Sequence, residues 1–424
     1  MITLKFILAN VELVKTKLAQ RNFDIKVIDE IVAFGTQKNE LLVELNELKA
    51  RRNEISDQIG KLAREKKETR SLKEEVIKIN EDISGIETDF NEIDFKVENM
   101  LLRIPNLPLD DVPVGKDEND NVILETWAEV EQKSFKILPH YEIATELDII
   151  DFKRAVKLSG TRFVIYKNEG ARLVRALMNF MLDTHISNGY KEILPNTLIL
   201  EEALYGTAQL PKFAEDLYKV NDSNLWLIST AEIPITNFYS QEIINLDKPI
   251  KFVGYSKSYR SEAGSGGRDT KGIIRMHEFH KVELVKITSQ KEALSEFEKT
   301  VDDAANILKL LKIPHRRVVL STGDMGFASK KTIDLEAWMP SEQRYREVSS
   351  ISICGDFQAQ RMKLRYKEDG KTLYANTING SGLAIDRIIA IILEQYQTEE
   401  GFIEIPEVLI PYFGKIQKIS KENK

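Results

Sequence analysis

The sequence contains very little cysteine and no long apolar run, and each absence excludes a class of structure. Cys354 is the single cysteine among 424 residues, which excludes an intramolecular disulfide and a cysteine-rich, four-ligand zinc site. No apolar run approaches the roughly 18 residues of a membrane helix, and Ile388–Leu393 is among the longest. The N-terminal segment lacks a basic leader followed by a small-residue cleavage site. We therefore expect a cytoplasmic protein without disulfides, zinc or a membrane-spanning segment.

The composition is that of a folded, acidic protein. Hydrophobic residues make up 42% of the chain and charged residues 30%. This apolar fraction is enough to bury a core, which excludes a wholly disordered chain. The length predicts about two to three domains. The net charge of -7, taken alone, argues weakly against a nucleic-acid partner.

One long stretch also lacks proline and glycine. Between Lys38 and Arg103 there is no proline, and the only glycines are Gly60 and Gly85. Apolar residues recur there at steps of four and three, the a/d pattern of a coiled coil, in two runs on either side of a polar segment at residues 64–71. This pattern predicts an antiparallel helical hairpin, an arm over about residues 38–100; a coiled coil between chains, or a helix docked on the protein's own core, is the alternative. The two runs are Leu41, Leu45, Leu48, Ile55, Ile59 and Leu62, then Leu72, Val76, Ile79, Ile83, Ile86, Phe90, Ile93, Val97 and Met100.

Basic residues gather near the tip of this predicted arm. From Lys49 to Lys73 there are nine basic and four acidic residues, a local net charge of +5. A solvated helix face is the ordinary explanation of such a charge run. Counterion release from a nucleic acid, however, depends on the local patch rather than on the total charge. The distal arm is therefore where an RNA partner would be expected to bind.

A proline-rich segment follows the arm. Pro105, Pro108 and Pro113 lie close together, and proline spaced in this way ends helices and predicts a linker. We therefore expect three parts in the chain: an N-terminal domain over 1–103, a linker over 104–121 and a second domain over 122–424.

The second domain has a mixed pattern of strands and helices. The expected strands are not each followed by a crossover helix, so a mainly antiparallel sheet flanked by helices is favoured over a doubly wound parallel sheet. The predicted fold class is α+β. The expected strands are Arg162–Tyr166, Leu225–Ile228, Phe252–Tyr255, Lys281–Ile287, Arg316–Leu320, Thr332–Trp338 and Met362–Tyr366, and the expected helices are Gly170–Ser187, Lys291–Leu311 and Leu383–Tyr396.

The densest cluster of chemically informative residues lies at 256–287. Two strand-like segments flank a loop with four glycines, but neither the Walker spacing nor a GxGxxG that opens a helix is present. Arginine can bind phosphate with two parallel hydrogen bonds, and an aromatic ring can stack on a purine. An ordinary surface hairpin is the alternative. The residues near the ends of this loop are Arg260, Glu262, Arg275, His277, Phe279 and Glu283.

Two further clusters follow along the chain. Arg346 and Glu347 precede two serines on a strand-like run; they form either a surface ion pair or a site for a metal–phosphate complex, since Mg²⁺ prefers carboxylates and phosphate oxygens. Residues 379–382 predict a turn that runs directly into an apolar helix carrying Arg387. A helix entry beside an arginine suits an anion, although this signal is weak taken alone.

In this order, the three clusters resemble motifs 2 and 3 of class II aminoacyl-tRNA synthetases. The segments LISTAEIPITN, YRSEAGSGGRDTKGIIRMHEFHKVELV, REVSS, GDFQAQR and NGSGLA resemble the signature segments of the seryl-tRNA synthetase family. The resemblance extends over nearly the whole chain and includes the helical hairpin, LYGTAQLPKF and the closing EIPEVLIPYF. It implies a class II catalytic domain that follows a tRNA-binding coiled-coil arm.

The resemblance also implies the reaction and the partners. The family forms seryl-adenylate from L-serine and ATP with Mg²⁺, and then transfers serine to the 3′-terminal adenosine hydroxyl of tRNA(Ser). The tRNA(Sec) of organisms that possess one is a further expected substrate. The arm is expected to contact the long variable arm and elbow of the tRNA, commonly one whose acceptor end enters the other subunit of a homodimer.

Carried over motif by motif, the resemblance assigns the ATP-binding and catalytic residues. Arg260, Glu347 and Arg387 are the expected catalytic residues. Arg260 would bind the α-phosphate and the reacting carboxylate, Phe279 would stack on adenine, and other arginines would neutralise the bent triphosphate. The full expected ATP site is Arg260, Ser261, Glu262, Arg275, Met276, Phe279, Arg346, Glu347, Val348, Ser349, Ser350 and Arg387.

The remaining expected sites follow in the same way. Glu347 and Ser350 would hold Mg²⁺. The expected serine site is Thr230, Ala231, Glu232, Arg260, Glu283 and Ser381. The expected tRNA contacts on the arm are Arg51, Arg52, Lys61, Arg64, Lys66, Lys67 and Arg70.

Five positions depart from the pattern of the family, and the departures leave open reduced activity or looser amino-acid selectivity. They are Asn196 and Ser229 for proline, Ala208 for glycine, Ile353 for asparagine and Gln360 for arginine.

Other protein classes are less favoured. A catalytically inactive paralogue would be expected to lose Arg260, Glu283, Glu347 or Arg387, an amino-acid:carrier-protein ligase would lack the arm, and a purely structural coiled coil would not need the catalytic clusters.

Overall fold

The computed structural model describes residues 1–264, 266–267, 269–414 and 416–421. The chain divides into two compact units, Met1–Ile104 and Pro105–Lys424, and each has its own core. In the part of the chain that is described, no helix is both long and apolar enough to cross a membrane.

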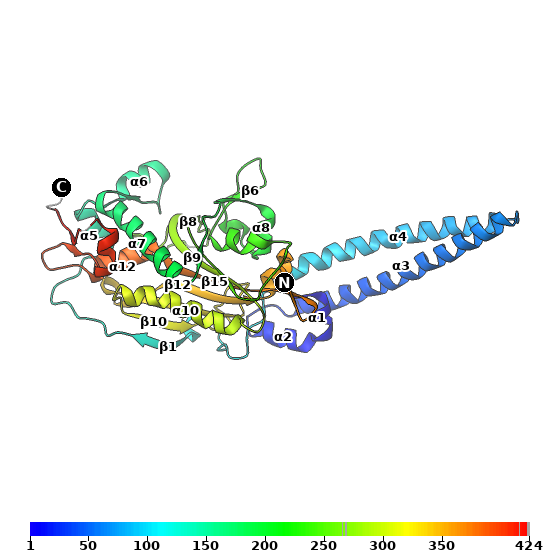
Figure 1. Ribbon diagram of the computed structural model, residues 1–424, viewed down its shortest axis with the longest axis horizontal. Helices are drawn as coiled ribbons and strands as arrows, with labels where there is room; N and C mark the ends of the chain where they lie inside the picture. The colour runs from blue at the N-terminus through cyan, green and yellow to red at the C-terminus, as the bar shows by residue number, and fades with distance from the viewer. Residues whose placement is uncertain (265, 268, 415, 422–424) are drawn as a thin grey trace. The chain divides into compact units, whose positions relative to one another are not determined.

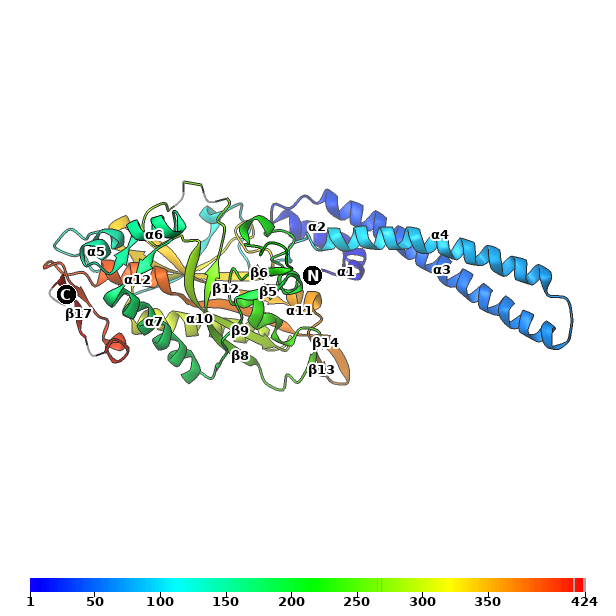
Figure 2. The same ribbon diagram turned by 90° about the horizontal axis from the view of Figure 1, so that it is seen from above.

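The N-terminal unit is built around a helical hairpin. Two long helices, α3 (Lys26–Arg64) and α4 (Arg70–Leu101), run side by side, as Figures 1 and 2 show. The 39 residues of α3 correspond to roughly 58 Å of helix. Apolar side chains of the predicted a/d runs form a buried seam between the helices: Leu45, Ile55, Ile79 and Ile83, with Leu48, Ile59, Leu72, Val76 and Ile86 packed against them.

The predicted helical hairpin is therefore confirmed, but α3 begins at Lys26 rather than near residue 38. Two short helices, α1 (Leu4–Ala9) and α2 (Val11–Ala19), pack against its first turns. Contact with α1 is so close at Gly35 that a Cβ atom there would lie 2.6 Å from Leu4 Cδ1. Further along, ion pairs join the two long helices, including Lys49–Glu87 at 2.7 Å.

The second unit is centred on an eight-stranded sheet. Every neighbouring pair is antiparallel except β4 and β8, which are parallel. The predicted antiparallel α+β domain is therefore confirmed. In spatial order the strands are β1 (Val122–Trp127), β10 (His315–Val319), β11 (Lys331–Met339), β12 (Arg344–Gly355), β15 (Asn376–Ala384), β9 (Glu278–Thr288), β8 (Ile250–Tyr259) and β4 (Lys191–Glu192).

Three helices pack on this sheet: α7 (Asn168–Ser187), α10 (Ala293–Leu310) and α12 (Ile385–Gln395). Their apolar faces and the sheet enclose the main core, in which Phe297 and Ile389 are almost fully buried. The smaller α-helices and strands are α5 (His140–Glu146), β2 (Ile150–Asp151), α6 (Phe152–Ser159), β3 (Ile165–Tyr166), β5 (Leu198–Leu200), α8 (Glu201–Gly206), β6 (Leu225–Leu227), α9 (Glu232–Thr236), β7 (Ile243–Ile244), α11 (Phe357–Met362), β13 (Arg365–Glu368), β14 (Lys371–Tyr374), β16 (Ile403–Glu404) and β17 (Lys418–Ile419).

Three local expectations were wrong. The expected strand Arg162–Tyr166 is shortened to β3, because Arg162 lies in a turn with a φ of 62. Residues 379–382 are not a turn, because they lie inside β15 and the helix begins only at Ile385. The glycines there permit close packing: a Cβ atom on Gly380 would lie 2.7 Å from Ile351 Cγ1. Residue Met362 belongs to α11 rather than to a strand, because Lys363 with φ 56 ends that helix before β13 begins.

The proline-rich segment is hydrogen-bonded to the second unit. The Asn106 backbone N–H donates to the Phe327 carbonyl at 2.9 Å, and Leu109 N–H donates to the Lys330 carbonyl at 3.0 Å. The Asn106 side chain also donates to the Cys354 carbonyl at 2.8 Å. These contacts explain why the boundary between the units falls at Ile104 and Pro105.

Candidate active site

One face of the sheet forms the floor of a cavity of about 650 Å³. Side chains alternate between the two faces of a strand. On β9, the side chains of Phe279, Lys281 and Glu283 line the cavity, while Val282 and Leu284 belong to the apolar core behind it. The strand thus places an aromatic ring, a cation and an anion in one row. We call this the active-site cavity.

The active-site cavity brings together most of the residues expected from the sequence. Ser261, Ser349, Arg346 and Ala231 lie outside its lining: Ser349 Oγ donates to the Ser381 carbonyl at 2.6 Å, and Ala231 packs in an apolar cluster with Phe252. The expected residues that line the cavity are Thr230, Glu232, Arg260, Glu262, Arg275, Met276, Phe279, Glu283, Glu347, Val348, Ser350, Ser381 and Arg387.

Two arginines reach this cavity from different elements. Arg260 directly follows β8, and its guanidinium lies 5.1 Å from the centre of the Phe279 ring, a cation–π contact. Arg387 on α12 donates to the Glu347 carbonyl at 2.8 Å and lies 3.3 Å from Glu347 Oε2. Desolvation alone would raise the pKa of Glu347, but the guanidinium groups of Arg387 and Arg260 hold it below its usual value.

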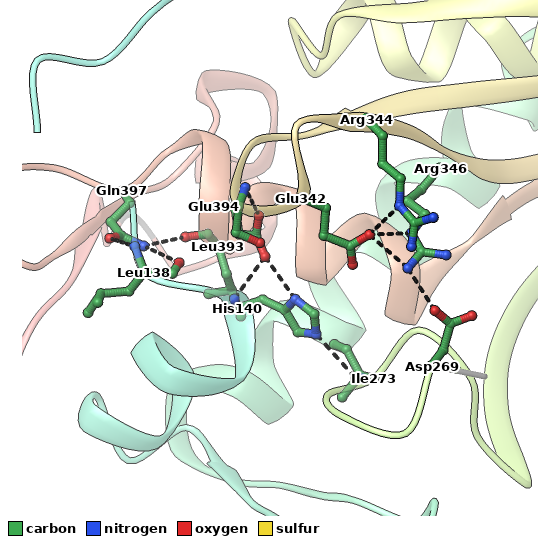
Figure 3. A network of polar contacts seen from close by, with 11 residues as sticks. Leu138, His140, Asp269, Ile273, Glu342, Arg344, Arg346, Leu393, Glu394 and Gln397 are labelled. Carbon is green, nitrogen blue, oxygen red and sulfur yellow. Dashed lines mark hydrogen bonds and ion pairs between the residues drawn. The ribbon is translucent and has the colours of Figure 1, made fainter. Parts of the chain in front are cut away.

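Two other arginines are held by carboxylates. Arg275 NH1 donates to Glu262 Oε2 at 2.6 Å. Arg346 NH2 lies 2.7 Å from both Asp269 Oδ1 and Glu342 Oε2, as Figure 3 shows. Asp269 belongs to the loop between β8 and β9, so this carboxylate joins the loop to β12.

A buried histidine contacts the same loop four residues further along, at Ile273. The backbone N–H of Ile273 donates to His140 Nε2 at 3.3 Å, and this nitrogen therefore carries no proton. The proton lies on Nδ1, which donates to Glu394 Oε1 at 2.9 Å (Figure 3). His140 passes so close to the loop that a Cβ atom on Gly272, whose φ is +77, would lie 2.0 Å from its Nε2. Glu394 lies on α12, so the helix that carries Arg387 also positions the loop.

The opposite part of the cavity is lined by acidic and hydroxyl groups. Glu283 is only 1% exposed and pairs with Ser381 across β9 and β15. Glu232 accepts a hydrogen bond from Gln358 Nε2 at 2.8 Å. Burial, and after it the neighbouring Glu283 carboxylate, raise the pKa of Glu232 to about 7. This end of the cavity suits a small molecule that carries an ammonium group and a hydrogen-bonding side chain.

The expected Mg²⁺ ligands lie on one strand, β12. The Glu347 side chain is 46% exposed, and Ser350 lines the cavity and pairs with Asp334 on β11. Asp334 Oδ1 is buried and has no hydrogen-bond partner among the described residues. Burial, and after it the Glu347 carboxylate, raise the pKa of Asp334 well above its usual value. Carboxylate and hydroxyl oxygens are ligands that Mg²⁺ prefers, so the residues present fit this ion.

The expected tRNA contacts lie around the tip of the helical hairpin. Apart from the partly exposed Arg52, all of them are exposed. Three form ion pairs on the hairpin surface, Arg51 with Glu75 at 2.5 Å, Lys67 with Glu65 at 2.7 Å and Arg70 with Glu74 at 3.0 Å. Such exposed pairs are weak, so they leave these basic side chains available for phosphate.

The positions that depart from the family pattern fall in different environments. Ala208 lines the active-site cavity with φ 66, which explains why glycine is usual there, since L-residues rarely adopt this conformation. Ser229 accepts from Arg260 Nε through its carbonyl at 3.4 Å. Ile353 is buried in the main core, Gln360 donates to Asp356 at 2.7 Å, and Asn196 is exposed.

Several residues of the site were missed by reasoning from the sequence. Lys281 has a signal in the sequence, because it alternates with Phe279 and Glu283 on a predicted strand. Asp269 and His140 carry no such signal, since their partners Arg346 and Glu394 lie far away along the chain.

Comparison with known proteins agrees with this site and fold. Residues 217–396 match the family described as tRNA synthetase class II core domain (G, H, P, S and T). The antiparallel sheet and its arginine-lined cavity thus define a class II aminoacyl-tRNA synthetase. Residues 1–108 match the family described as seryl-tRNA synthetase N-terminal domain.

Relatives described as serine–tRNA ligases match along the whole chain. The serine–tRNA ligase of Metamycoplasma arthritidis is 58% identical over 99% of both chains, and that of Mycoplasma mobile is 51% identical over 99% of this chain and 100% of its own. The crystal structure of Pyrococcus horikoshii seryl-tRNA synthetase complexed with ATP is 36% identical, with a TM-score of 0.94 over 99% of both chains. The chain belongs to the seryl-tRNA synthetase family.

Proposed function

We propose that this protein attaches L-serine to tRNA(Ser) in two steps, formation of seryl-adenylate from serine and ATP and transfer of serine to the 3′-terminal adenosine hydroxyl. The observation that carries the proposal is the active-site cavity, whose lining includes the cations Arg260 and Arg387 and the acidic residues Glu232 and Glu283. A zwitterionic amino acid fits between groups of opposite charge. Membership of the seryl-tRNA synthetase family supports the choice of amino acid.

The first step needs no general base. The serine carboxylate is already ionised, so the enzyme has to align it with the α-phosphorus of ATP and stabilise the charge that develops there. A carboxylate oxygen bonds to the α-phosphorus as the bond to the departing pyrophosphate breaks. Arg260 performs both tasks, since its guanidinium binds the carboxylate and the α-phosphate. Phe279 and Met276 enclose adenine, while Arg275, Arg346 and Arg387 bind the triphosphate. Glu347 and Ser350 would hold Mg²⁺, which would supply further positive charge beside the triphosphate.

In the second step the 3′-terminal hydroxyl of the tRNA attacks the activated carbonyl carbon of serine. A carbon–oxygen bond forms to the tRNA, the bond between serine and the phosphate of AMP breaks, and the hydroxyl proton passes to the departing phosphate oxygen. Arg260 remains beside the α-phosphate and stabilises AMP as it leaves. The cavity therefore serves both steps without a covalent bond to the enzyme.

The helical hairpin binds the tRNA in this proposal. We assign residues 1–103 as the tRNA-binding domain, 104–121 as the connection and 122–424 as the catalytic domain. The basic residues around the hairpin tip bind the long variable arm by phosphate contacts. The enzyme is a cytoplasmic homodimer, and the resemblance to the family supports this assignment.

Amino-acid-dependent exchange of pyrophosphate into ATP tests the first step. We expect exchange with serine and at least about 100-fold lower kcat/KM with alanine, because a site built to hydrogen-bond a hydroxyl strongly rejects an analogue without one. Charging of tRNA(Ser) with labelled serine tests the second step. Absence of serine-dependent exchange would overturn the proposed function.

A further inference from the structure

A buried lysine lies between the residues proposed to bind serine. Lys281 is 7% exposed and lines the active-site cavity from β9. Its Nζ atom lies 2.6 Å from Glu283 Oε2 and donates to Thr230 Oγ1 at 2.7 Å. A buried ammonium is costly unless it is paired and hydrogen-bonded. Both conditions are met here by groups that belong to the proposed amino-acid site.

These contacts determine the direction of the hydrogen bond that Thr230 makes. A hydroxyl group has one proton and two acceptor lone pairs. Thr230 Oγ1 accepts from Lys281 Nζ and also from the Glu232 backbone N–H, at 3.2 Å. With both lone pairs used, the Thr230 hydroxyl can only donate. The acceptor within reach is Glu283 Oε2, at 3.3 Å.

Lys281 also holds the Glu283 carboxylate beside this donor. Glu283 Oε2 lies within 3.3 Å of both Thr230 Oγ1 and Lys281 Nζ. Glu232 is close enough for the two carboxylates to repel each other. The Lys281 ammonium offsets this repulsion and holds the Glu283 carboxylate in place as an acceptor.

We propose that Lys281 is a specificity-determining positioning residue, which fixes Thr230 as a donor and Glu283 as an acceptor side by side. This inference rests on the proposed function. A hydroxyl is the small side-chain group that both donates and accepts, so a β-hydroxy amino acid satisfies both partners at once. Alanine has no hydroxyl and makes neither hydrogen bond, so Thr230 and Glu283 keep only their 3.3 Å contact with each other and alanine binds less tightly. Lys281 acts through Thr230 and Glu283 rather than on the reacting atoms.

The substitution Lys281→Met tests this proposal, because it keeps the length of the side chain and removes the donor and the charge. We expect the KM for serine in pyrophosphate exchange to rise on the order of 10- to 100-fold. The ratio of kcat/KM for serine to that for alanine should fall by about 10-fold or more. The KM for ATP should stay within about twofold of the wild-type value, a separation that general damage to the fold would not produce.

A double-mutant cycle tests whether Lys281 acts through Thr230. We expect Thr230→Val to reduce the serine-to-alanine ratio, and we expect the double variant to lose less than the product of the two single losses. Lys281→Gln keeps a donor for Thr230 without the charge, and it should retain more of the discrimination than Lys281→Met. It also serves as the test if the methionine variant does not fold, as thermal denaturation would reveal.

A matched control is Lys257→Met on β8. Lys257 pairs with Glu278 at 2.7 Å and its side chain is 46% exposed, and it is not among the residues that line the cavity as described. Its substitution should leave both KM values and the discrimination ratio unchanged.

Three outcomes would overturn the role of Lys281. The first is an unchanged serine-to-alanine ratio in Lys281→Met and Lys281→Gln. The second is a lower KM for serine, as expected if Lys281 only competes with the substrate ammonium for Glu283. The third is a double variant whose loss equals the product of the single losses. Failure of the proposed function is distinguishable, because it would abolish serine-dependent exchange in the wild-type protein.

Discussion

Asp269 Oδ1 lies 2.7 Å from Arg346 NH2, and Asp269 Oδ2 lies 3.8 Å from Arg275 Nε. A single loop carboxylate thus contacts two of the arginines that we propose for the triphosphate. In the proposed function these arginines bind the triphosphate, so ATP would compete with Asp269 for Arg346 and Arg275.

We predict that Asp269→Asn lowers the KM for ATP by about threefold to tenfold. The amide is uncharged and competes less well with the triphosphate for the guanidinium groups. Pyrophosphate exchange at saturating serine measures the change, and the KM for serine is the internal control. A raised KM for ATP would show instead that Asp269 prepares Arg346 for binding.

Arg260→Ala should abolish serine-dependent pyrophosphate exchange. Removal of a preorganised group that stabilises transition-state charge costs about 100- to 1,000-fold, and Arg260 also aligns the carboxylate. As a matched control, Arg154→Ala removes an exposed arginine that pairs with Asp151 on the surface. A near-wild-type exchange rate in the Arg260 variant would remove this residue from the catalytic role.

The affinity for serine should depend on pH near neutrality. The pKa of Glu232 is raised to about 7, so this carboxyl is largely protonated at pH 6 and largely ionised at pH 8. An ionised carboxylate attracts the substrate ammonium, and the KM for serine should therefore fall as the pH rises from 6 to 8. The variant Glu232→Gln should lose this dependence, which initial-rate measurements across the range can check. Equal pH profiles in the two proteins would contradict the assignment of Glu232.

Deletion of residues 38–100, with a short glycine linker in their place, should separate the two steps. Adenylate formation needs only the second unit, whose core is its own, so pyrophosphate exchange should persist. Charging of tRNA(Ser) should be lost because the phosphate contacts of the arm are removed. Unchanged charging of tRNA(Ser) would contradict the proposed role of the arm.

The helical hairpin shows what could be predicted from the sequence alone. Spacing of four and three between apolar residues is a local property of a helix surface, and the seam from Leu45 to Ile83 formed as expected. The beginning of α3 at Lys26 could not be predicted in this way. The first turns of α3 pack against α1 and α2, and the a/d spacing of the hairpin seam carries no information on those contacts.

The segment around Gly380 shows a second limit. Glycines between an apolar strand and a helix are typical of a turn. Here Gly380 lies in the middle of β15, and glycine is needed there because a Cβ atom would lie 2.7 Å from Ile351 Cγ1 on the neighbouring strand. Such close approach is a property of the assembled sheet, so the sequence pattern favoured the wrong local structure.

The sequence by itself determined the arm, the antiparallel α+β architecture and the family, because these follow from local periodicity and from motifs that are contiguous in the chain. It also located the basic patch within a chain of net charge -7. Only the tertiary structure decided which charged and polar groups meet. The pairings of Asp269 with Arg346 and of Lys281 with Thr230 depend on strand register and loop path, and both bring together side chains that are more than 50 residues apart in the sequence.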